Sequence, residues 1–453
     1  MRLVIIGAGP GGYETAVAAA KAGLEVTVIS DGPVGGTCLN EGCIPTKALC
    51  RNAEVLETVR RAGEFGLDVP AFQVDWEQVM RRKDAVVEQL RGGVEFLLRG
   101  KNIQLVYGKA SFKDAHTVYV GDAEYPADFI IIATGSYSAT LPIPGNDLPG
   151  VVSSREILAL DAVPRRLCVI GAGVIGLEFA SIFTRFGAEV SVVEYCKDIL
   201  PRFDVDLAKR LKQTLSKRGI SIDTSAQVQA IEATQDGLQV RYLKKDKECV
   251  IEADKVLMAV GRRARVDSVN LDDIGIAYTP RGIQTDARMR TNLPHIYAIG
   301  DVTGGMMLAH VATFQGLVAL DDILGQAGIA HAPQHIDLSV VPAAVFTDPE
   351  VATVGLTEED CEAKGLSVKC LKSMYRANGK AVSMGEPEGF CKVIVSQDDG
   401  RILGCHLFGA HAADIIQEVT ALISRKATLP QFQDIIHAHP TLTEVLQSAV
   451  HSA

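Results

Sequence analysis

Two cysteines and a lysine have a spacing that suits thiol chemistry. Cys38 and Cys43 lie five positions apart in a glycine-framed stretch, and Lys47 follows the second cysteine by four positions. A disulfide between the cysteines would close a loop so short that chain entropy gives it only about 2 kcal/mol. Such a bond is a weak staple, but sulfurs that cannot separate are suited to opening and closing. From these residues alone a redox pair, a structural disulfide and half of a zinc site stay open, although zinc usually needs a second close pair and the chain has no C-x-x-C.

Size, charge and cysteine usage limit what the chain can be. At 453 residues it is too long for one ordinary core, so several domains are expected. A formal charge of −10 argues against nucleic acid or an anionic membrane as the main partner. The chain runs from Met1 directly into an apolar strand, its apolar runs are too short to span a bilayer, and most of its cysteines are isolated. We therefore expect a cytoplasmic protein.

A glycine loop near the N-terminus has the spacing of a dinucleotide-binding site. Gly7, Gly9 and Gly12 form G-x-G-x-x-G after a β-branched run and before Tyr13–Ala22, an alanine-rich segment that is expected to be helical. The first glycine permits a tight turn, the second lets the backbone approach a pyrophosphate, and the third lets strand and helix pack closely. Unpaired N–H groups at the helix N-terminus then face the anion. This pattern predicts a bound dinucleotide.

The same unit recurs in the middle of the chain. Gly171, Gly173 and Gly176 repeat the fingerprint between a strand and a helix, and Glu194 follows the last glycine by 18 residues. An acid at that position accepts the ribose hydroxyls of an adenosine. Two fingerprints indicate two dinucleotides, such as a bound flavin and a mobile nicotinamide. Because Glu194 would repel a 2′-phosphate and no arginine follows it closely, we expect NAD rather than NADP.

The first unit departs from this pattern at the acidic position. Ser30 stands 18 residues after Gly12, and Asp31 follows it. A serine cannot replace the charge of a carboxylate. Asp31 is therefore the candidate for the ribose contact of the first site.

Three further apolar strands end in glycine beside a group that can meet a nucleotide. They close with Ala133-Thr134-Gly135, with Gly261-Arg262 and with Gly300-Asp301. Taken alone, each is a buried strand with a turn glycine, and Arg262 is surface charge. An acid after such a strand, as at Asp301, can nevertheless bond a sugar or ribityl hydroxyl near a helix N-terminus.

The last third of the chain has a different pattern. From about residue 337 short strands alternate with Gly, Asn and Asp, and amphipathic helices are expected over Ala412–Lys426 and Thr443–Val450. This is the pattern of an α+β unit without a nucleotide signature. The expected strands are Val340–Phe346, Val368–Met374, Phe390–Ser396 and Ile402–Phe408.

This unit carries one pair of residues that could do acid–base chemistry. His439 precedes Glu444 by five residues across a proline turn. That spacing suits a base held by a carboxylate. Taken alone, a loop histidine with satisfied hydrogen bonds is the simpler interpretation.

Together and in this order, these motifs resemble the flavin-dependent pyridine nucleotide-disulfide oxidoreductases of class I. The resemblance covers essentially the whole chain, and the thiol and His-Pro-Thr…Glu motifs are highly specific. It implies an α/β fold with two Rossmann-like dinucleotide-binding domains and a C-terminal α+β dimerisation domain. The implied boundaries are 1–145 with 265–335 for FAD, 146–264 for NAD, and 336–453 for dimerisation.

The resemblance also assigns roles to single residues. Cys38 would exchange with substrate, and Cys43 would be the thiolate against the flavin. Lys47 would pair with Glu178 near the flavin, while His439 as base and Glu444 as its orienting carboxylate would come from the other subunit of a homodimer. The implied contacts with FAD and NAD fall at Gly7, Gly9, Gly12, Asp31, Thr37, Lys47, Ala133, Thr134, Gly135, Gly171, Gly173, Gly176, Glu194, Gly261, Arg262, Gly300 and Asp301; no metal is implied.

The implied activity is the oxidation of protein-bound dihydrolipoamide, with electrons passing through the cysteine pair and FAD to NAD⁺. The implied partners are lipoyl-bearing proteins of 2-oxo-acid dehydrogenase or glycine-cleavage systems. A glutathione-type reductase is held off by Glu194 alone. A docking subunit of a multienzyme complex is the other alternative, against which the intact Cys38, Cys43 and His439 argue. The chain also has Ala264-Arg265 where the family commonly has a proline after Gly-Arg, which from the sequence touches only a loop.

Overall fold

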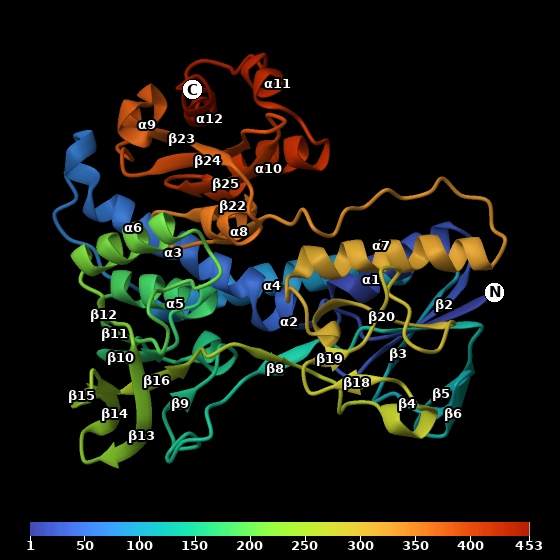
Figure 1. Ribbon diagram of the computed structural model, residues 1–453. Helices are drawn as coiled ribbons and strands as arrows, with labels where there is room; N and C mark the ends of the chain where they lie inside the picture. The colour runs from blue at the N-terminus through green and yellow to red at the C-terminus, as the bar shows by residue number, and fades with distance from the viewer. Residues whose placement is uncertain (453) are drawn as a thin grey trace.

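Two α/β units lie side by side, and a third unit covers the one drawn in green (Figure 1). The structure is a computed structural model that describes residues 1–452. Within those residues, no helix is long and apolar enough to cross a membrane. Two parallel sheets and one antiparallel sheet form the centres of the three units, which confirms the predicted fold class.

The first unit is built on a parallel sheet in the order β20-β7-β1-β2-β3. Its β-branched strands are largely buried, as those of parallel sheets generally are, because helices pack on one face of the sheet and smaller β elements cover the other. The strands are β1 (Arg2–Ile6), β2 (Glu25–Ser30), β3 (Ile103–Tyr107), β7 (Phe129–Ile132) and β20 (Ile296–Ala298), and the helices packed against them are α1 (Pro10–Lys21), α4 (Trp76–Leu98) and α7 (Ala309–Gln326). Because β20 comes late in the chain, this unit is completed only after the chain has passed through the second.

Smaller elements cover one side of this sheet. They are the three-stranded sheet β4 (Ser111–Asp114), β5 (Thr117–Val120) and β6 (Ala123–Pro126), and the hairpin of β18 (Tyr278–Thr279) and β19 (Gly282–Ile283). The predicted helix over Tyr13–Ala22 begins earlier, at Pro10. Proline is well suited to the first helical position, since its missing N–H would have no partner there.

The second unit repeats this design with the order β12-β11-β10-β16-β9. Its strands are β9 (Val151–Val152), β10 (Arg166–Ile170), β11 (Glu189–Val193), β12 (Ser221–Asp223) and β16 (Lys255–Met258), with helices α5 (Val174–Arg185) and α6 (Val205–Lys217) and an antiparallel sheet of β13 (Ala226–Thr234), β14 (Gly237–Lys244) and β15 (Lys247–Ala253). The two glycine loops make equivalent backbone hydrogen bonds to the ends of β2 and β11. Gly7 N donates to Ile29 O at 2.8 Å, and Gly171 N donates to Val193 O at 2.9 Å. Ser30 and Glu194 therefore occupy equivalent positions.

The chain leaves and re-enters the first unit through one short antiparallel pair. Strand β8 (Ser136–Ser138) leads out, strand β17 (Arg262–Ala264) leads back, and Arg262 lies opposite Ser138. The two crossings thus hold each other in register between the dinucleotide-binding units (Figure 1).

The third unit is an antiparallel sheet in the order β21-β22-β25-β24-β23, covered by helices. Its elements are β21 (Ala343–Val345), β22 (Val351–Gly355), α8 (Glu358–Ala363), β23 (Val368–Met374), α9 (Gly379–Ser383), β24 (Phe390–Ser396), β25 (Ile402–Phe408), α10 (Ala412–Ser424), α11 (Leu429–Gln433) and α12 (Glu444–Val450). The strand predicted over Val340–Phe346 is shorter, because Pro342 has no N–H to donate to a ladder. Strand β22 was not predicted.

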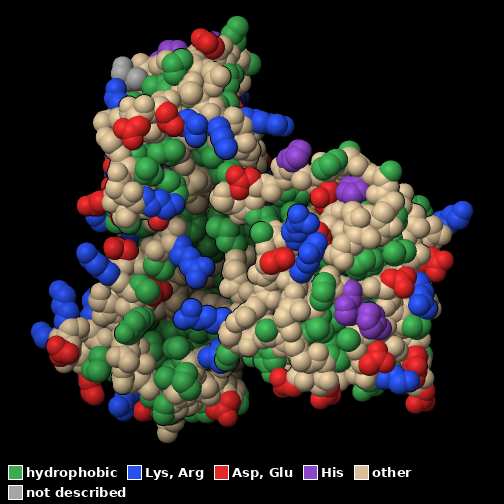
Figure 2. Space-filling model, turned by 45° about the vertical axis from the view of Figure 1, so that its right-hand side comes forward, with side chains coloured by type: hydrophobic (Ala, Val, Ile, Leu, Met, Phe, Trp, Pro, Cys, Tyr) green, Lys and Arg blue, Asp and Glu red, His purple; other side chains and the backbone are tan. Residues whose placement is uncertain are grey.

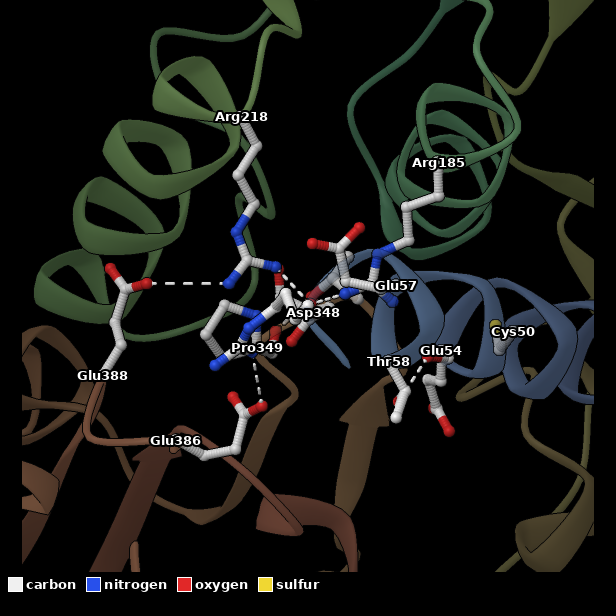
Figure 3. A network of polar contacts seen from close by, with 12 residues as sticks. Cys50, Glu54, Glu57, Thr58, Arg185, Arg218, Asp348, Pro349, Glu386 and Glu388 are labelled. Atoms are coloured by element: carbon white, nitrogen blue, oxygen red, sulfur yellow. Dashed lines mark hydrogen bonds and ion pairs between the residues drawn. The ribbon is translucent and has the colours of Figure 1, made fainter. Parts of the chain in front are cut away.

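A polar network joins all three units where helices α3 (Cys43–Arg60), α5 and α6 end (Figure 3). Arg185 at the end of α5 and Arg218 just after α6 both pair with Asp348 of the third unit. Arg61, just after α3, reaches Glu386 of the third unit at 3.1 Å. The network thus fixes the ends of the two helices that carry Cys43 and Glu178.

Candidate active site

The thiol pair lies on two short-connected helices beside the first glycine loop. Cys38 belongs to α2 (Gly36–Glu41), and Cys43 is the first residue of α3. Gly35 has φ +92°, and a Cβ at Gly36 would lie 2.7 Å from the Cα of Gly9. Glycines before Cys38 therefore let α2 start directly against the dinucleotide loop. The pattern of the sequence had identified the pair but not the helices that carry it.

The two sulfurs share one proton unequally. The ten cysteines are free thiols, and a hydrogen bond between the Cys38 and Cys43 side chains is the main cause of opposite pKa shifts in the two groups. This bond lowers the pKa of Cys43 to about 7, with burial opposing the shift and the Lys47 charge assisting it. The same bond and burial raise the pKa of Cys38. The reduced pair therefore keeps its negative charge on Cys43, at the N-terminus of α3, where the helix dipole also favours an anion.

We expect the thiolate of Cys43 to form as pH rises through about 7. Because its pKa is lowered, the thiolate is present above that pH and is lost below it, whereas buried thiols with raised pKa values stay protonated. The ultraviolet thiolate absorbance of the reduced protein, followed against pH, measures this directly. Cys43→Ser should remove the transition near neutrality; a transition that persists in this variant would assign the thiolate to another cysteine.

Lys47 follows Cys43 by one turn of α3 and forms an ion pair with Glu178 of the second unit. Lys47 Nζ lies 2.9 Å from Glu178 Oε2, and the Lys47 ammonium sits 4.4 Å from the centre of the Phe346 ring. Glu178 also accepts a hydrogen bond from the backbone N of Phe346 at 3.0 Å. Burial alone would lower the pKa of Lys47, but the Glu178 charge and hydrogen bond outweigh it and hold the pKa above its usual value. The cation stays charged one turn from Cys43; Phe346 was not singled out by the sequence.

A continuous cleft of about 3550 Å³ runs past both glycine loops and the thiol pair. Figure 2 shows the molecule hollowed between its two lobes, with basic side chains near the hollow. Of the sequence-predicted nucleotide contacts, all line the cleft except Gly176. Cys38, Cys43 and Glu178 also line it, whereas His439 and Glu444 do not.

The first glycine loop fits the pyrophosphate of a dinucleotide. Gly7 has φ +116°, and a Cβ there would lie 2.2 Å from Ala133 O; a Cβ on Gly12 would lie 1.9 Å from Gly7 O. Gly9 has only one atom within 4 Å of its missing Cβ, so its backbone faces open space at the start of α1, where no side chain caps the helix. A side chain at the other two positions would destroy the turn, and the bare helix N-terminus can receive an anion.

Asp301 sits in a polar cluster at the crossing strands. Ser136 Oγ donates to Asp301 Oδ2 at 2.5 Å and accepts from Arg262 Nε at 2.7 Å. Gly300 N donates to Gln315 Oε1 at 2.7 Å. Ser136 and Gln315 were missed by the sequence, which offered no spacing signal for either. The cluster places Asp301 and Arg262 together in the cleft.

In the second unit, Glu194 lies beside the second glycine loop and lines the cleft. It is buried, and its carboxylate accepts from Ala172 N at 2.6 Å and Cys196 N at 2.7 Å. A Cβ on Gly173 would meet nothing within 4 Å, so this glycine opens to the cleft. The negative charge therefore lies where an adenosine ribose follows the pyrophosphate loop.

We expect Glu194→Gln to raise the kcat/KM ratio of NADPH over NADH by about tenfold or more, because it removes repulsion of the 2′-phosphate and weakens a charged hydrogen bond to the ribose. Initial rates with both nucleotides measure it. Glu189→Gln, at the exposed start of the same strand, is the matched control and should leave the ratio unchanged. A wild-type preference for NADPH would contradict the assignment.

His439 and Glu444 form a pair away from this cleft. His439 Nδ1 lies 2.8 Å from Glu444 Oε1, and Thr441 N donates to Glu444 Oε2 at 2.8 Å. The His439 bond, then that of Thr441, lower the pKa of Glu444. The His439 side chain is 79% exposed, on the segment that connects α11 to α12. An oriented imidazole thus faces out of its own chain.

Residues 1–316 match the family model of pyridine nucleotide-disulphide oxidoreductase, and residues 341–450 match that family's dimerisation domain. The chain belongs to this family. A dihydrolipoyl dehydrogenase of Chlamydia muridarum is 41% identical to this oxidoreductase over 448 residues, which cover 98% of the chain and 94% of the relative. One from Bacillus subtilis is 39% identical over 456 residues, covering 99% and 96%.

Solved structures agree with this family assignment. The HOCl-induced flavoprotein disulfide reductase RclA from Escherichia coli superposes with a TM-score of 0.88 at 30% identity, covering 100% of this chain and 99% of that one. LpdA from Mycobacterium tuberculosis gives 0.90 at 27% identity, covering 100% and 99%. The oxidoreductase is an FAD- and NAD-dependent enzyme, and its third unit is a dimerisation domain.

Proposed function

We propose that this oxidoreductase is a dihydrolipoyl dehydrogenase that oxidises protein-bound dihydrolipoamide and reduces NAD⁺. The observation that carries the proposal is the position of the thiol pair: Cys38 and Cys43 line the cleft beside the first dinucleotide loop, and the Lys47–Glu178 ion pair lies one turn along the same helix. The lowered pKa of Cys43 agrees with this position. Relatives of about 40% identity over the full length, named dihydrolipoyl dehydrogenase, support the choice of substrate.

The chemistry begins on the oxidised pair. A dihydrolipoamide thiolate attacks Cys38 Sγ, the Cys38–Cys43 bond breaks, and Cys43 leaves as a thiolate, which its lowered pKa favours. The second substrate thiolate then attacks the substrate sulfur of the mixed disulfide. The lipoamide ring closes, Cys38 leaves, and two electrons now reside on the cysteine pair. Lys47, held by Glu178, stabilises the charge on Cys43.

Substrate protons need a base at the thiol pair, and we assign this role to His439 of the other subunit. Glu444 holds the imidazole through Nδ1, which leaves Nε2 to take a proton from the entering thiol and return it later. The exposure of His439 and its absence from the cleft of its own chain support a site shared across a homodimer.

FAD, when bound, supplies a two-electron carrier between the dithiol and NAD⁺. We place FAD along Gly7–Gly12, Asp31, Thr37, Lys47, Ala133–Gly135 and Gly300–Asp301. NAD is placed along Gly171–Gly176, Glu194 and Gly261–Arg262. These residues bind and orient the nucleotides, and Gly176 acts only through packing, since its Cβ would lie 2.0 Å from Gly171 O.

We also retain the domain boundaries 1–145 with 265–335, 146–264 and 336–453. Support comes from β20, which joins the first sheet although it follows the second unit in the chain.

The isolated cysteines support a reducing, cytoplasmic location. Lipoyl-bearing proteins of 2-oxo-acid dehydrogenase or glycine-cleavage systems are the proposed partners. Within residues 1–452 no group of His, Cys, Asp and Glu has the arrangement of a metal site.

Side-by-side assays test the proposal. NADH and NADPH are each offered with lipoamide and with glutathione disulfide. The enzyme should turn over lipoamide with NADH far faster than the other combinations. Glutathione reduction driven by NADPH would identify a glutathione-type reductase, and no turnover of any disulfide in an FAD-loaded protein would leave the docking role.

A further inference from the structure

In the first dinucleotide site, the position equivalent to Glu194 is occupied by Ser30, whose hydroxyl cannot supply the charge of a carboxylate. Ser30 is equivalent to Glu194 by the backbone bonds of the two glycine loops. Its side chain is buried, and its Oγ donates to Gly32 O at 2.9 Å. The hydroxyl is thus used to hold the local turn, whereas Glu194 presents a charge.

The next residue carries a charge that is held from far along the chain. Asp31 Oδ2 accepts from Arg265 Nη2 at 2.6 Å, and both residues line the cleft. Asp31 Oδ1 has no hydrogen-bond partner among the residues that the structure describes. An ionised carboxylate can accept several hydrogen bonds, so one oxygen is anchored and the other stays available to a ligand.

Arg265 is itself fixed by the strands that cross between the units. Its backbone N donates to Gly135 O at 2.9 Å, and its carbonyl accepts from Thr134 Oγ1 at 2.9 Å. The two departures from the family pattern, Ser30-Asp31 and Ala264-Arg265, therefore meet in one ion pair. The side chains are 44% and 38% exposed, and so exposed a pair contributes little to stability. Its place in the cleft makes a ligand-binding role the better account.

We propose that Arg265 is a positioning residue of the FAD site: its guanidinium holds one oxygen of Asp31, the candidate for the ribose contact, so that the other oxygen faces the adenosine-ribose hydroxyls of FAD. Arg265 immediately follows the strand that returns from the NAD-binding unit. Retention of FAD consequently depends on that strand staying in place. The inference rests on the FAD site and not on the choice of disulfide substrate, so a failed lipoamide assay would leave it intact.

The rate of FAD release from the holoenzyme, followed by the rise in flavin fluorescence, tests the proposal. We expect Asp31→Asn to speed release roughly ten- to a hundredfold, the effect of losing a charged hydrogen bond. Arg265→Gln should have a smaller effect in the same direction, partly rescued by Arg265→Lys. Salt should speed release of FAD from the wild type, because the Debye screening length falls from about 8 Å at physiological ionic strength to about 3 Å at 1 M. It should not speed release from Arg265→Gln, which has no ion pair to screen at this position. Glu232→Gln, which breaks an equally exposed pair with Arg241 remote from the cleft, is the control and should change nothing.

Two further experiments distinguish a contact between Asp31 and the ribose from an ion pair that only holds the two strands together. An FAD analogue whose adenosine ribose lacks both hydroxyls should be released faster than FAD by the wild type, and Asp31→Asn should add no further effect. The double variant Asp31→Arg with Arg265→Asp keeps an ion pair but moves the carboxylate to position 265. It should therefore release FAD about as fast as Asp31→Asn does. Additive effects of the analogue and Asp31→Asn, slow release in the exchanged variant, or unchanged release in Asp31→Asn would overturn the proposal.

Discussion

Cys38→Ser and Cys43→Ser should each lose lipoamide turnover, and they should differ in colour. Either change removes a sulfur that the exchange requires, so no residual turnover is expected. Cys43 carries the charge of the reduced pair, whereas the pKa of Cys38 is raised. Cys38→Ser should therefore keep a long-wavelength absorbance from a thiolate beside the oxidised flavin, and Cys43→Ser should lose it.

Hydride transfer between nicotinamide and flavin needs neither sulfur, so both variants should keep NADH oxidation by artificial acceptors. Cys50→Ser is the matched control, because Cys50 lies on the same helix with its Sγ 3.5 Å from Phe346 O and a pKa raised by burial. It should retain lipoamide turnover and the absorbance of the wild type. Swapped colours in the two variants would reverse the roles of Cys38 and Cys43.

His439→Ala should reduce lipoamide turnover by roughly 10² to 10⁴, the usual range for loss of a general acid–base. Glu444→Gln should cause a smaller loss, since it weakens the orientation of the ring without removing the base. NADH oxidation by artificial acceptors should be unaffected in both variants. His451→Ala, an exposed histidine at the end of α12, is the control and should behave as wild type.

Mixed dimers extend this test to the shared site. Refolding inactive Cys38→Ser with inactive His439→Ala should restore activity, because each mixed dimer then owns one complete site. Native mass spectrometry verifies that the subunits have exchanged. Exchanged subunits without recovered turnover would place His439 in the site of its own chain.

The parts of the fold that the sequence predicted were those with strong local periodicity. The strand–glycine loop–helix units were predicted because both the hydrophobic pattern and the glycine positions are local. The predicted strand over Phe390–Ser396 is confirmed with the same bounds. Helices α2 and α3 were not predicted, because glycines interrupt the apolar pattern around Cys38 and Cys43.

The candidate site shows the same limit. Lys47 and Glu178 meet across 131 positions, and the sequence supplied that contact only through a family resemblance. Asp31 and Arg265 are 234 positions apart and belong to no shared motif, so their contact could be found only in three dimensions. The exposure of His439 likewise depends on packing of the third unit, which no local pattern encodes.

Thiol mapping after reduction without nicotinamide tests the central claim most directly. The oxidised enzyme is mixed anaerobically with dihydrolipoamide, quenched with an alkylating reagent and digested. We predict that Cys38 and Cys43 become alkylated together, while the other eight cysteines keep the labelling of the untreated enzyme. Flavin reduction by dihydrolipoamide in a protein whose Cys38 and Cys43 labelling does not change would contradict electron entry through this pair.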